Sequence, residues 1–420
     1  MEIKVKKVEC IKGVVNAPPS KSFSHRAFLI ASLAEGISYI KFPLYSEDTC
    51  ATLHACQALG TDIKTDVNKC RIKGTSGSFN TPEDVLDVKN SGTTLRLMGS
   101  AASLASQYTI LTGDESLRTR PMQELINSLE KLGVDIISSR DNGRAPIIIK
   151  GGLEGGETSI PGDISSQFIS SILISAPYAS KPVNLEITGK FISRPYVNMT
   201  IDVMKEFGVQ VDYNGINRFR VEPQMYKATE YVVEGDYSSA SYLIAAAASL
   251  DSDLTVRNLK LKSKQGDKQI LDIVKDMGCQ IRQDDNQVYI KGHGDLHGVD
   301  VNLEDTPDLL PTVAALGAIA EGTTHIYGAE HARLKETDRI HACAEELSNL
   351  GVRVKENRDG LTVKGGAKGG VVDSHNDHRM VMALYLIGLK VGGVIIRNPS
   401  VYDVSFPNFI EIMENLTKIK

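Results

Sequence analysis

The chain has 420 residues, of which 41% are hydrophobic and 24% are charged, and its formal net charge is −5 at pH 7. This length is too great for one ordinary hydrophobic core and predicts a globular protein of two domains. The acidic balance disfavours nucleic acid or a membrane as a partner, so a cationic site is expected only as a local pocket.

Two features of the chain predict its compartment. Six cysteines without a C-x-x-C pair predict reduced thiols and a cytoplasmic protein. The start, Met1-Glu2-Ile3-Lys4, predicts a charged strand rather than a signal peptide, and no long uncharged apolar run predicts a membrane span.

The first cationic segment, from Pro18 to Arg26, reads PPSKSFSHR and is followed by an apolar run over residues 27–34. The two prolines bar a helix until about Ser20, so a helix is expected to begin near Lys21. Lys21 and Arg26 would then lie near a helix N-terminus, where free N–H groups and the helix dipole favour an anion. A serine-capped helix carrying two solvated cations is the alternative interpretation.

One pattern recurs five times along the chain: an amphipathic helix, a glycine, and a short alternating strand. The intervals between these glycines are 70 to 75 residues, and the positions are Gly60, Gly133, Gly208, Gly278 and Gly351. Glycine at this place ends a helix in a left-handed cap. A period this long predicts stacked supersecondary units.

The pattern also predicts how the two domains share the chain. A sixth helix over residues 409–416 meets the C-terminus before its strands, so the missing strands are expected to be N-terminal, at 3–8 and 9–12. The chain would cross between domains near 14–20 and return near 234–236. The expected domains are therefore 15–233 and 1–14 plus 234–420.

Polar clusters precede three further helices in the first half of the chain. Gly92, in the segment NSGTTLR before an expected helix from Leu97, would let backbone N–H groups approach an oxyanion, although an ordinary N-cap explains it equally well. Arg120 precedes Pro121 and an expected helix over 122–132, where it could bind a carboxylate or a phosphate in a bidentate contact. Ser165, Ser166 and Gln167 precede an expected helix over 169–176 and suit a phosphate and a sugar-like hydroxyl.

The second half of the chain adds carboxylates to the cations. Asp308 is expected in an apolar setting before a helix, where partial desolvation would favour its neutral form, and an N-cap role is the alternative. On an expected helix, Lys335 and Arg339 share one face and indicate an anion between them, unless this is a solvated surface helix. Arg379 opens another expected helix, over 380–389, and no cluster shows metal-ligand spacing.

Together these segments closely resemble the family of 5-enolpyruvylshikimate-3-phosphate synthases, which are enolpyruvyl transferases. The likeness covers almost the whole chain and rests on six segments: Ser20-Lys21-Ser22 with Arg26, Asn90–Arg96, Arg120-Pro121, Ser165-Ser166-Gln167, Lys335–Arg339 and Asp377-His378-Arg379. The resemblance implies an α/β fold of two domains, each an inside-out α/β barrel of three βαβαββ units. It also implies transfer of the enolpyruvyl group of phosphoenolpyruvate to the 5-hydroxyl of shikimate 3-phosphate, with release of phosphate. This reaction belongs to the shikimate pathway, which leads to chorismate and the aromatic amino acids.

The resemblance also implies roles for individual residues. Shikimate 3-phosphate would be held by Lys21, Ser22, Arg26, Ser165, Ser166, Gln167, Ser193, Asp308 and Lys335. Phosphoenolpyruvate would be held by Lys21, Gly92, Arg120, Gln167, Arg339 and Arg379. Asp308 would act as base toward the 5-hydroxyl, Glu336 as acid toward the methylene carbon, and Lys21 as proton shuttle or charge stabiliser. A monomer is expected, with these two small molecules as its partners and with neither a metal nor another cofactor.

Two other functions fit the sequence less well. A sister enolpyruvyl transferase acts on a UDP-sugar and commonly carries a loop cysteine, which is missing beside Arg120. An RNA-binding protein built from related repeats would need a basic surface and stacking aromatic residues, whereas this chain is acidic, has 6% aromatic residues and lacks tryptophan. The chain departs from the family at His331, where many members carry Asn or Glu, and at Val404, where several bacterial members carry Lys.

Overall fold

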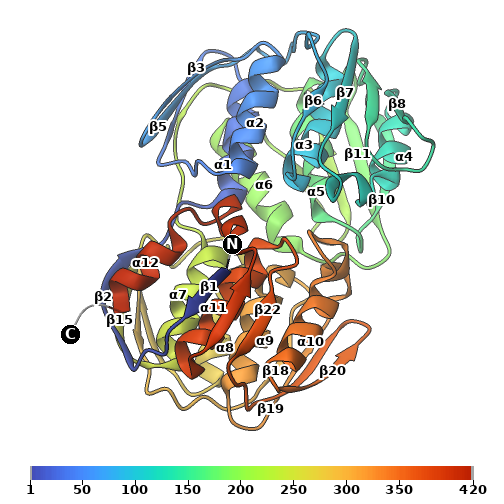
Figure 1. Cartoon of the computed structure of the whole chain (residues 1–420). Coiled ribbons are helices and arrows are strands. Elements are labelled where there is room, and N and C mark those ends of the chain that lie inside the picture. Colours follow the sequence, from blue (N-terminus) through green and yellow to red (C-terminus); the bar gives the residue numbers. More distant parts are fainter. Residues whose placement is uncertain (1, 418–420) are drawn as a thin grey trace. The chain divides into compact units, whose positions relative to one another are not determined.

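The computed structural model describes residues 2–417. Contacts divide the chain into two units (Figure 1): a middle unit, Pro19–Val233, and a terminal unit that joins the residues up to Pro18 with those from Glu234 onward. Within the described part, no helix combines the length and the apolar character needed to span a membrane.

The middle unit contains twelve strands and six α-helices. The strands are β3 (Ile37–Lys41), β4 (Asp62–Asp66), β5 (Lys69–Lys73), β6 (Leu86–Asp87), β7 (Tyr108–Thr112), β8 (Asp135–Ser138), β9 (Ile147–Lys150), β10 (Gly156–Pro161), β11 (Val183–Thr188), β12 (Asp212–Tyr213), β13 (Arg218–Val221) and β14 (Glu230–Val232). The helices are α1 (Lys21–Leu33), α2 (Glu47–Ala58), α3 (Gly92–Ala101), α4 (Gln123–Lys131), α5 (Ser166–Ser175) and α6 (Arg194–Glu206). The strands form three sheets, ordered β14-β3-β5-β4, β6-β7-β9-β8 and β10-β11-β13-β12.

The terminal unit has the same kind of elements. Among its described residues the strands are β1 (Glu2–Val5), β2 (Cys10–Asn16), β15 (Asp251–Arg257), β16 (Gln280–Asp284), β17 (Gln287–Lys291), β18 (Asp300–Asn302), β19 (Thr323–Tyr327), β20 (Arg353–Asn357), β21 (Gly360–Lys364), β22 (Gly370–Asp373) and β23 (Val394–Arg397). The helices are α7 (Tyr237–Ser249), α8 (Ile270–Asp276), α9 (Leu310–Ile319), α10 (Arg339–Asn349), α11 (His378–Val391) and α12 (Phe409–Thr417). The sheets are ordered β16-β17-β15-β2, β18-β19-β21-β20 and β1-β23-β22.

Every four-stranded sheet pairs one outer strand in parallel and the remaining strands antiparallel. The order βαβαββ is continuous in the repeats that begin at β6, β10 and β18. In two other repeats the first strand is distant in sequence from the rest of the repeat. Strand β14 pairs in parallel with β3, and β2 pairs in parallel with β15. The sixth sheet receives β1, so an N-terminal strand completes it as expected, whereas β2 belongs to another sheet.

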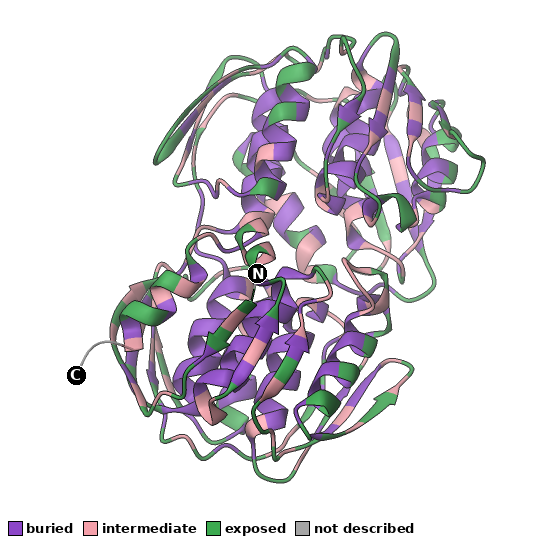
Figure 2. Cartoon of the chain, in the orientation of Figure 1, coloured by how far each residue is buried: buried purple, intermediate pink, exposed green. Residues whose placement is uncertain are grey.

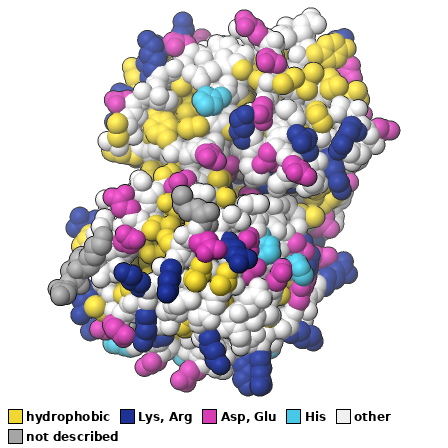
Figure 3. Space-filling view, in the orientation of Figure 1, with side chains coloured by type: hydrophobic (Ala, Val, Ile, Leu, Met, Phe, Trp, Pro, Cys, Tyr) yellow, Lys and Arg dark blue, Asp and Glu magenta, His cyan; other side chains and the backbone are white. Residues whose placement is uncertain are grey.

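Helices such as α1, α7, α9 and α11 form the interior of their units and the sheets lie outside them, which confirms the mixed α/β fold class (Figure 2). Helices α1, α7, α9 and α11 are buried along almost their whole length. This is expected for α9, which is apolar on every side, whereas α1 and α11 also bury charged residues near their starts. Strands such as β5 and β17 alternate between buried and less buried positions, since successive side chains point to opposite faces. On the face drawn in Figure 3, lysines and arginines are interspersed with aspartates and glutamates.

The repeat glycines adopt the left-handed backbone that the pattern predicted. Their φ angles lie between 77° and 108°, at Gly60, Gly133, Gly208, Gly278 and Gly351. A residue with a Cβ atom is strained in this conformation, which explains why glycine stands at each helix end.

Candidate active site

In the middle unit, predicted site residues lie at the first turns of three buried helices. Lys21 is the first residue of α1, Gly92 of α3 and Ser166 of α5. Each helix has a serine N-cap whose hydroxyl accepts a backbone N–H, namely Ser20, Ser91 and Ser165. The helix expected from Leu97 therefore begins five residues earlier, at Gly92. The helix expected at Ile169 begins at Ser166.

Lys21 forms a salt bridge that the sequence analysis missed. Its Nζ lies 2.8 Å from Oδ2 of Asp48, and both side chains are largely buried. The carbonyl of Asp48 also accepts hydrogen bonds from the hydroxyls of Ser91 and Thr94, at 3.3 and 3.4 Å. Asp48 therefore ties Lys21 to the start of α3.

Arg120 lies directly against Gly92. A Cβ atom built on Gly92 would lie 2.6 Å from Nη1 of Arg120, and Nη2 donates to Oδ1 of Asn90 at 2.8 Å. The Arg120 side chain is buried and follows a 3₁₀ turn, η2 (Leu117–Thr119). Pro121 precedes the N-cap of α4, Met122, and so lies outside that helix.

Gln167 connects the first turns of α3 and α5. Its Oε1 accepts from Nη1 of Arg96 at 2.6 Å, and its Nε2 donates to Oγ1 of Thr93 at 2.9 Å. Because the donor and the acceptor of the amide are both engaged, the orientation of Gln167 is fixed. The segment from Asn90 to Arg96 thus contributes the side chains of Thr93 and Arg96 to this site, in addition to Gly92.

Arg26 is a buried cross-link between three helices. Its guanidinium donates to the hydroxyls of Thr200 and Ser170 and to the carbonyls of Ser22 and Tyr196, at 2.7 to 3.4 Å. Burial lowers the pKa of Arg26 to about 10. The remaining predicted residue of this unit, Ser193, precedes α6 with a left-handed φ of 53°.

A chain of buried hydrogen bonds joins α1 to α3 through α2. Nδ1 of His25 lies 2.7 Å from Oγ1 of Thr52, which lies 2.7 Å from Oγ1 of Thr94. Burial, with Lys21 and Arg26 nearby, holds the pKa of His25 well below its usual range. His25 is therefore neutral at neutral pH and connects helices rather than carrying charge.

In the terminal unit, Asp308 is the centre of a group of cations. Its Oδ1 lies 3.3 Å from Nζ of Lys335 and 2.9 Å from Nη1 of Arg339, and its Oδ2 lies 2.9 Å from Nη2 of Arg379. Asp308 lies in η5 (Pro307–Leu309), just before α9. The expected apolar setting is therefore wrong, because residues distant in the sequence bring three positive charges to this carboxylate.

Lys335 does not share a helix with Arg339, contrary to expectation. Lys335 follows η6 (Glu330–Leu334), which contains His331, and has an extended backbone. The helix α10 begins only at Arg339, because Asp338 is its N-cap and accepts the backbone N–H of His341. An anion does lie between Lys335 and Arg339, and it is the Asp308 carboxylate.

Arg339 is fully buried among carboxylates. It lies 2.7 Å from Asp377, 2.6 Å from Glu336 and 2.9 Å from Asp308. Burial alone would lower the pKa of Arg339, but the negative charges of Asp377, Glu336 and Asp308 raise it. Asp377 is also the N-cap of α11 and accepts the N–H of Arg379 at 2.8 Å.

A further buried carboxyl group, Asp267, escaped the sequence analysis. It lies in η4 (Gly266–Gln269) and accepts a hydrogen bond from Ser238 in the first turn of α7. Burial and the negative charge of Asp308 raise the pKa of Asp267 to about 7. The sequence carries no local signal for this, because Asp267 and Asp308 are forty-one positions apart.

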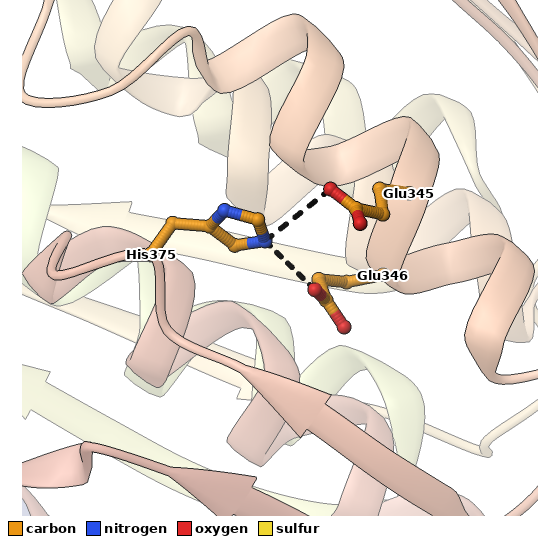
Figure 4. A group of neighbouring side chains, drawn as sticks. All are labelled: Glu345, Glu346 and His375. Carbon is orange, nitrogen blue, oxygen red and sulfur yellow. Dashed lines mark hydrogen bonds and ion pairs between the residues drawn. The ribbon is translucent and has the colours of Figure 1, made fainter.

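One group of histidine and carboxylate side chains in residues 2–417 has its donor atoms close together (Figure 4). Glu345, Glu346 and His375 place one donor atom each within 4.8 Å of one another. Nε2 of His375 lies only 2.7 Å from Oε1 of Glu346, so the two groups bind each other directly. This is the geometry of a hydrogen-bonded ion pair rather than that of ligands around a metal ion.

Comparison with known proteins identifies relatives over the whole length. A family profile described as EPSP synthase (3-phosphoshikimate 1-carboxyvinyltransferase) matches residues 5–413. The chain is 56% identical to 3-phosphoshikimate 1-carboxyvinyltransferase of Methanosphaera stadtmanae over 100% of both chains. It is also 56% identical to that of Methanothermobacter thermautotrophicus over 98% of both chains. A solved EPSP synthase from Acinetobacter baumannii superimposes with a TM-score of 0.83 at 26% identity, covering 99% of this chain and 98% of that one.

Proposed function

The chain belongs to the family of EPSP synthase, 3-phosphoshikimate 1-carboxyvinyltransferase, and on this premise we propose which residues carry its reaction. It is an enzyme that transfers the enolpyruvyl group of phosphoenolpyruvate to shikimate 3-phosphate, a step of aromatic amino acid biosynthesis. One observation carries the assignment of residues: cations and polar groups gather at the N-termini of buried helices in each unit. Such positions favour anions, and both substrates carry several negative charges.

Phosphoenolpyruvate is proposed to bind Lys21, Gly92, Arg120, Gln167, Arg339 and Arg379. The contact of Arg120 with Gly92 supports this, because it places a guanidinium beside free N–H groups at the start of α3. Lys21 forms an ion pair with Asp48, and Arg339 forms one with Glu336. A bound phosphate would replace these carboxylates as the partner of the two cations.

Shikimate 3-phosphate is proposed to bind Lys21, Ser22, Arg26, Ser165, Ser166, Gln167, Ser193, Asp308 and Lys335. The serines at the start of α5 support this assignment, since hydroxyls and N–H groups bind a phosphate without adding charge. Arg26 would exchange its bonds to the carbonyls of Ser22 and Tyr196 for the substrate carboxylate.

The proton transfers are proposed to involve Asp308, Glu336 and Lys21. Asp308 would take the proton of the 5-hydroxyl, and its carboxylate lies within 3.3 Å of Lys335, Arg339 and Arg379. Glu336 would take up a proton once the substrate phosphate has replaced it on Arg339, donate that proton to the methylene carbon of phosphoenolpyruvate, and take one back from the resulting methyl group as phosphate leaves. Lys21 would relay a proton or balance the charge of the tetrahedral intermediate, which then loses phosphate.

The test is an assay of phosphate release from phosphoenolpyruvate with shikimate 3-phosphate, run beside a UDP-sugar acceptor. Asp308→Asn is expected to lower kcat by about 10²–10⁴-fold if Asp308 is the base. Lys21→Met is expected to weaken binding of both substrates, whereas Lys41→Met is a matched control at a partly exposed position and breaks a surface pair with Glu230. Normal turnover of Asp308→Asn would show that Asp308 is not the base. Intact binding of both substrates by Lys21→Met would show that Lys21 does not contact both of them.

The compartment and the oligomeric state are also proposed. All six cysteines are free thiols, which supports the reducing cytoplasm as the site of action. A monomer is proposed as the oligomeric state. Light scattering of the purified protein at micromolar concentration tests the second point.

A further inference from the structure

The turn that carries the Asp377-His378-Arg379 segment is held in an unfavourable backbone conformation. His375 and Asn376, between β22 and α11, have φ angles of 51° and 54°. Two consecutive non-glycine residues in the left-handed region cost roughly 1 kcal/mol or more each, so the surroundings must hold them there. Local hydrogen bonds contribute: the N–H of His375 donates to Asp373 at 2.8 Å, and the N–H of Asp377 donates to the carbonyl of Ser374 at 2.9 Å.

The helix α10 attaches to this turn at two points. At its first residue, Arg339 binds the carboxylate of Asp377 at 2.7 Å. Two turns later, Glu346 binds Nε2 of His375 at 2.7 Å (Figure 4). The Glu346 side chain is only 3% exposed, and its other oxygen accepts from Asn349 at 3.1 Å. The second attachment is therefore a part-buried hydrogen bond between a histidine and a carboxylate, for which geometry matters more than at the surface.

We propose that His375, gripped by Glu346, is a positioning residue that holds the turn so that Asp377 and Arg379 keep Arg339 and the start of α11 in place for phosphoenolpyruvate. This inference rests on the proposed roles of Arg339 and Arg379. Arg379 follows His375 by four positions and donates its backbone N–H to Asp377, so a shift of the turn would move all three groups.

The grip depends on the charge of His375. The charged groups that face it are Glu345 and Glu346 on α10 and Asp373 on β22, and Glu345 also lies 3.9 Å from His341. The hydrogen bond with Glu346 raises the pKa of His375 above its ordinary value. Burial alone would raise the pKa of Glu346, but the hydrogen bond with His375 outweighs this effect and lowers it. Because the folded pKa of His375 is raised, the pair is complete at pH values below about 6.5 and weakens as the pH rises through the folded pKa.

The chain offers variants that separate the grip from the fold. Asparagine tolerates left-handed backbone better than most residues, so His375→Asn keeps the turn but cannot carry the charge or reach Glu346. Glu346→Gln keeps the shape but removes the negative partner. His341→Asn is the matched control, because His341 on α10 forms a second His–Glu pair, with Glu356 on β20 at 3.0 Å, and its side chain is 62% exposed.

The experiment is the pH dependence of KM for phosphoenolpyruvate, together with the His375 titration followed by NMR in the full-length enzyme. The wild-type KM should rise above the His375 pKa. His375→Asn should show a roughly 5- to 10-fold higher KM at pH 6.5, kcat within about twofold, and no such rise. Glu346→Gln should move both the rise in KM and the pKa of His375 measured by NMR to lower pH. His341→Asn should give the same KM profile and the same His375 pKa as the wild type.

Two results would overturn the inference, and they are distinct from failure of the residue assignments. A KM profile of His375→Asn that matches the wild type would show that the pair does not position the site. A His375 pKa at its ordinary value, unaffected by Glu346→Gln, would show that His375 does not form the proposed pair with Glu346. The NMR titration and the amide exchange of residues 374–377 need no substrate, so they remain decisive even if Arg339 and Arg379 prove not to bind phosphoenolpyruvate.

Discussion

Gly92 is the first residue of α3, and an added Cβ atom there would lie 2.6 Å from Nη1 of Arg120. Gly92→Ala must therefore displace the guanidinium from its place against the helix start. We expect KM for phosphoenolpyruvate to rise roughly 10-fold, equivalent to about 1.4 kcal/mol, with a smaller change in KM for shikimate 3-phosphate. Steady-state kinetics with each substrate varied in turn measures both values.

Gly99, on the same helix, provides the control for this substitution. A Cβ atom at Gly99 would meet only the ends of two flexible side chains, Leu125 at 3.0 Å and Met122 at 3.3 Å. Gly99→Ala should leave both KM values unchanged. An equal rise in KM for the two variants would mean that helix packing, and not the place of Arg120, is responsible.

Asp267 predicts a pH dependence of stability. Its folded pKa of about 7 lies above the unfolded value of about 3.9, so the folded state binds more protons between these pH values. The free energy of unfolding should therefore fall as the pH rises from about 4 to 7, by at most about 1.4 kcal/mol per pH unit. Asp267→Asn should remove this decline, which urea unfolding at pH 5, 6, 7 and 8 would detect. An equally steep decline in the variant would assign the proton to another group.

One hydroxyl joins three helices of the middle unit. Oγ1 of Thr52 on α2 contacts both His25 on α1 and Thr94 on α3, each at 2.7 Å. Thr52→Val keeps the volume but leaves two buried polar groups without this partner, so we expect a loss of about 1–3 kcal/mol of unfolding free energy. Ser249→Ala, which removes a buried hydroxyl bonded only to its own helix at Ala246, should cost less. The inference of a joining role fails if the two variants are equally stable in urea.

The element boundaries show what a periodic pattern can predict. The glycine caps follow from one local requirement, a left-handed φ, and all five were predicted correctly. Helix starts were predicted too late at Gly92 and Ser166 because the first turns hold polar residues, which the apolar pattern does not mark. The helix expected through Lys335 was wrong, since the N-cap at Asp338 starts α10 only at Arg339.

The two ends of the described chain belong to one unit. Strand β1 pairs with β23, and the buried Val5 packs on Gly388 of α11. Deleting residues 1–8 should raise amide exchange in β23 and α11 while leaving β3 and β5 of the middle unit unchanged. Hydrogen-exchange mass spectrometry reads both units in one experiment.

Point variants refine this test. Val5→Ala removes buried methyl groups and should cost about 1 kcal/mol or more, whereas Val14→Ala changes a side chain that is 55% exposed and should cost little. Faster exchange spread evenly over both units after the deletion would contradict the assignment of β1 to the terminal unit alone.

The amino-acid sequence determined the features that depend on neighbouring residues: the repeat, its left-handed glycines, the mixed α/β class, and the polar first turns that contain Lys21, Gly92 and Ser166. These follow from backbone sterics and helix-end chemistry, which act over a few residues. Tertiary structure alone decided the pairs Lys21–Asp48, Arg339–Asp377 and His375–Glu346, and the three cations around Asp308. The energy of a charge pair depends on its distance and burial, and packing sets both for residues that are far apart in the chain.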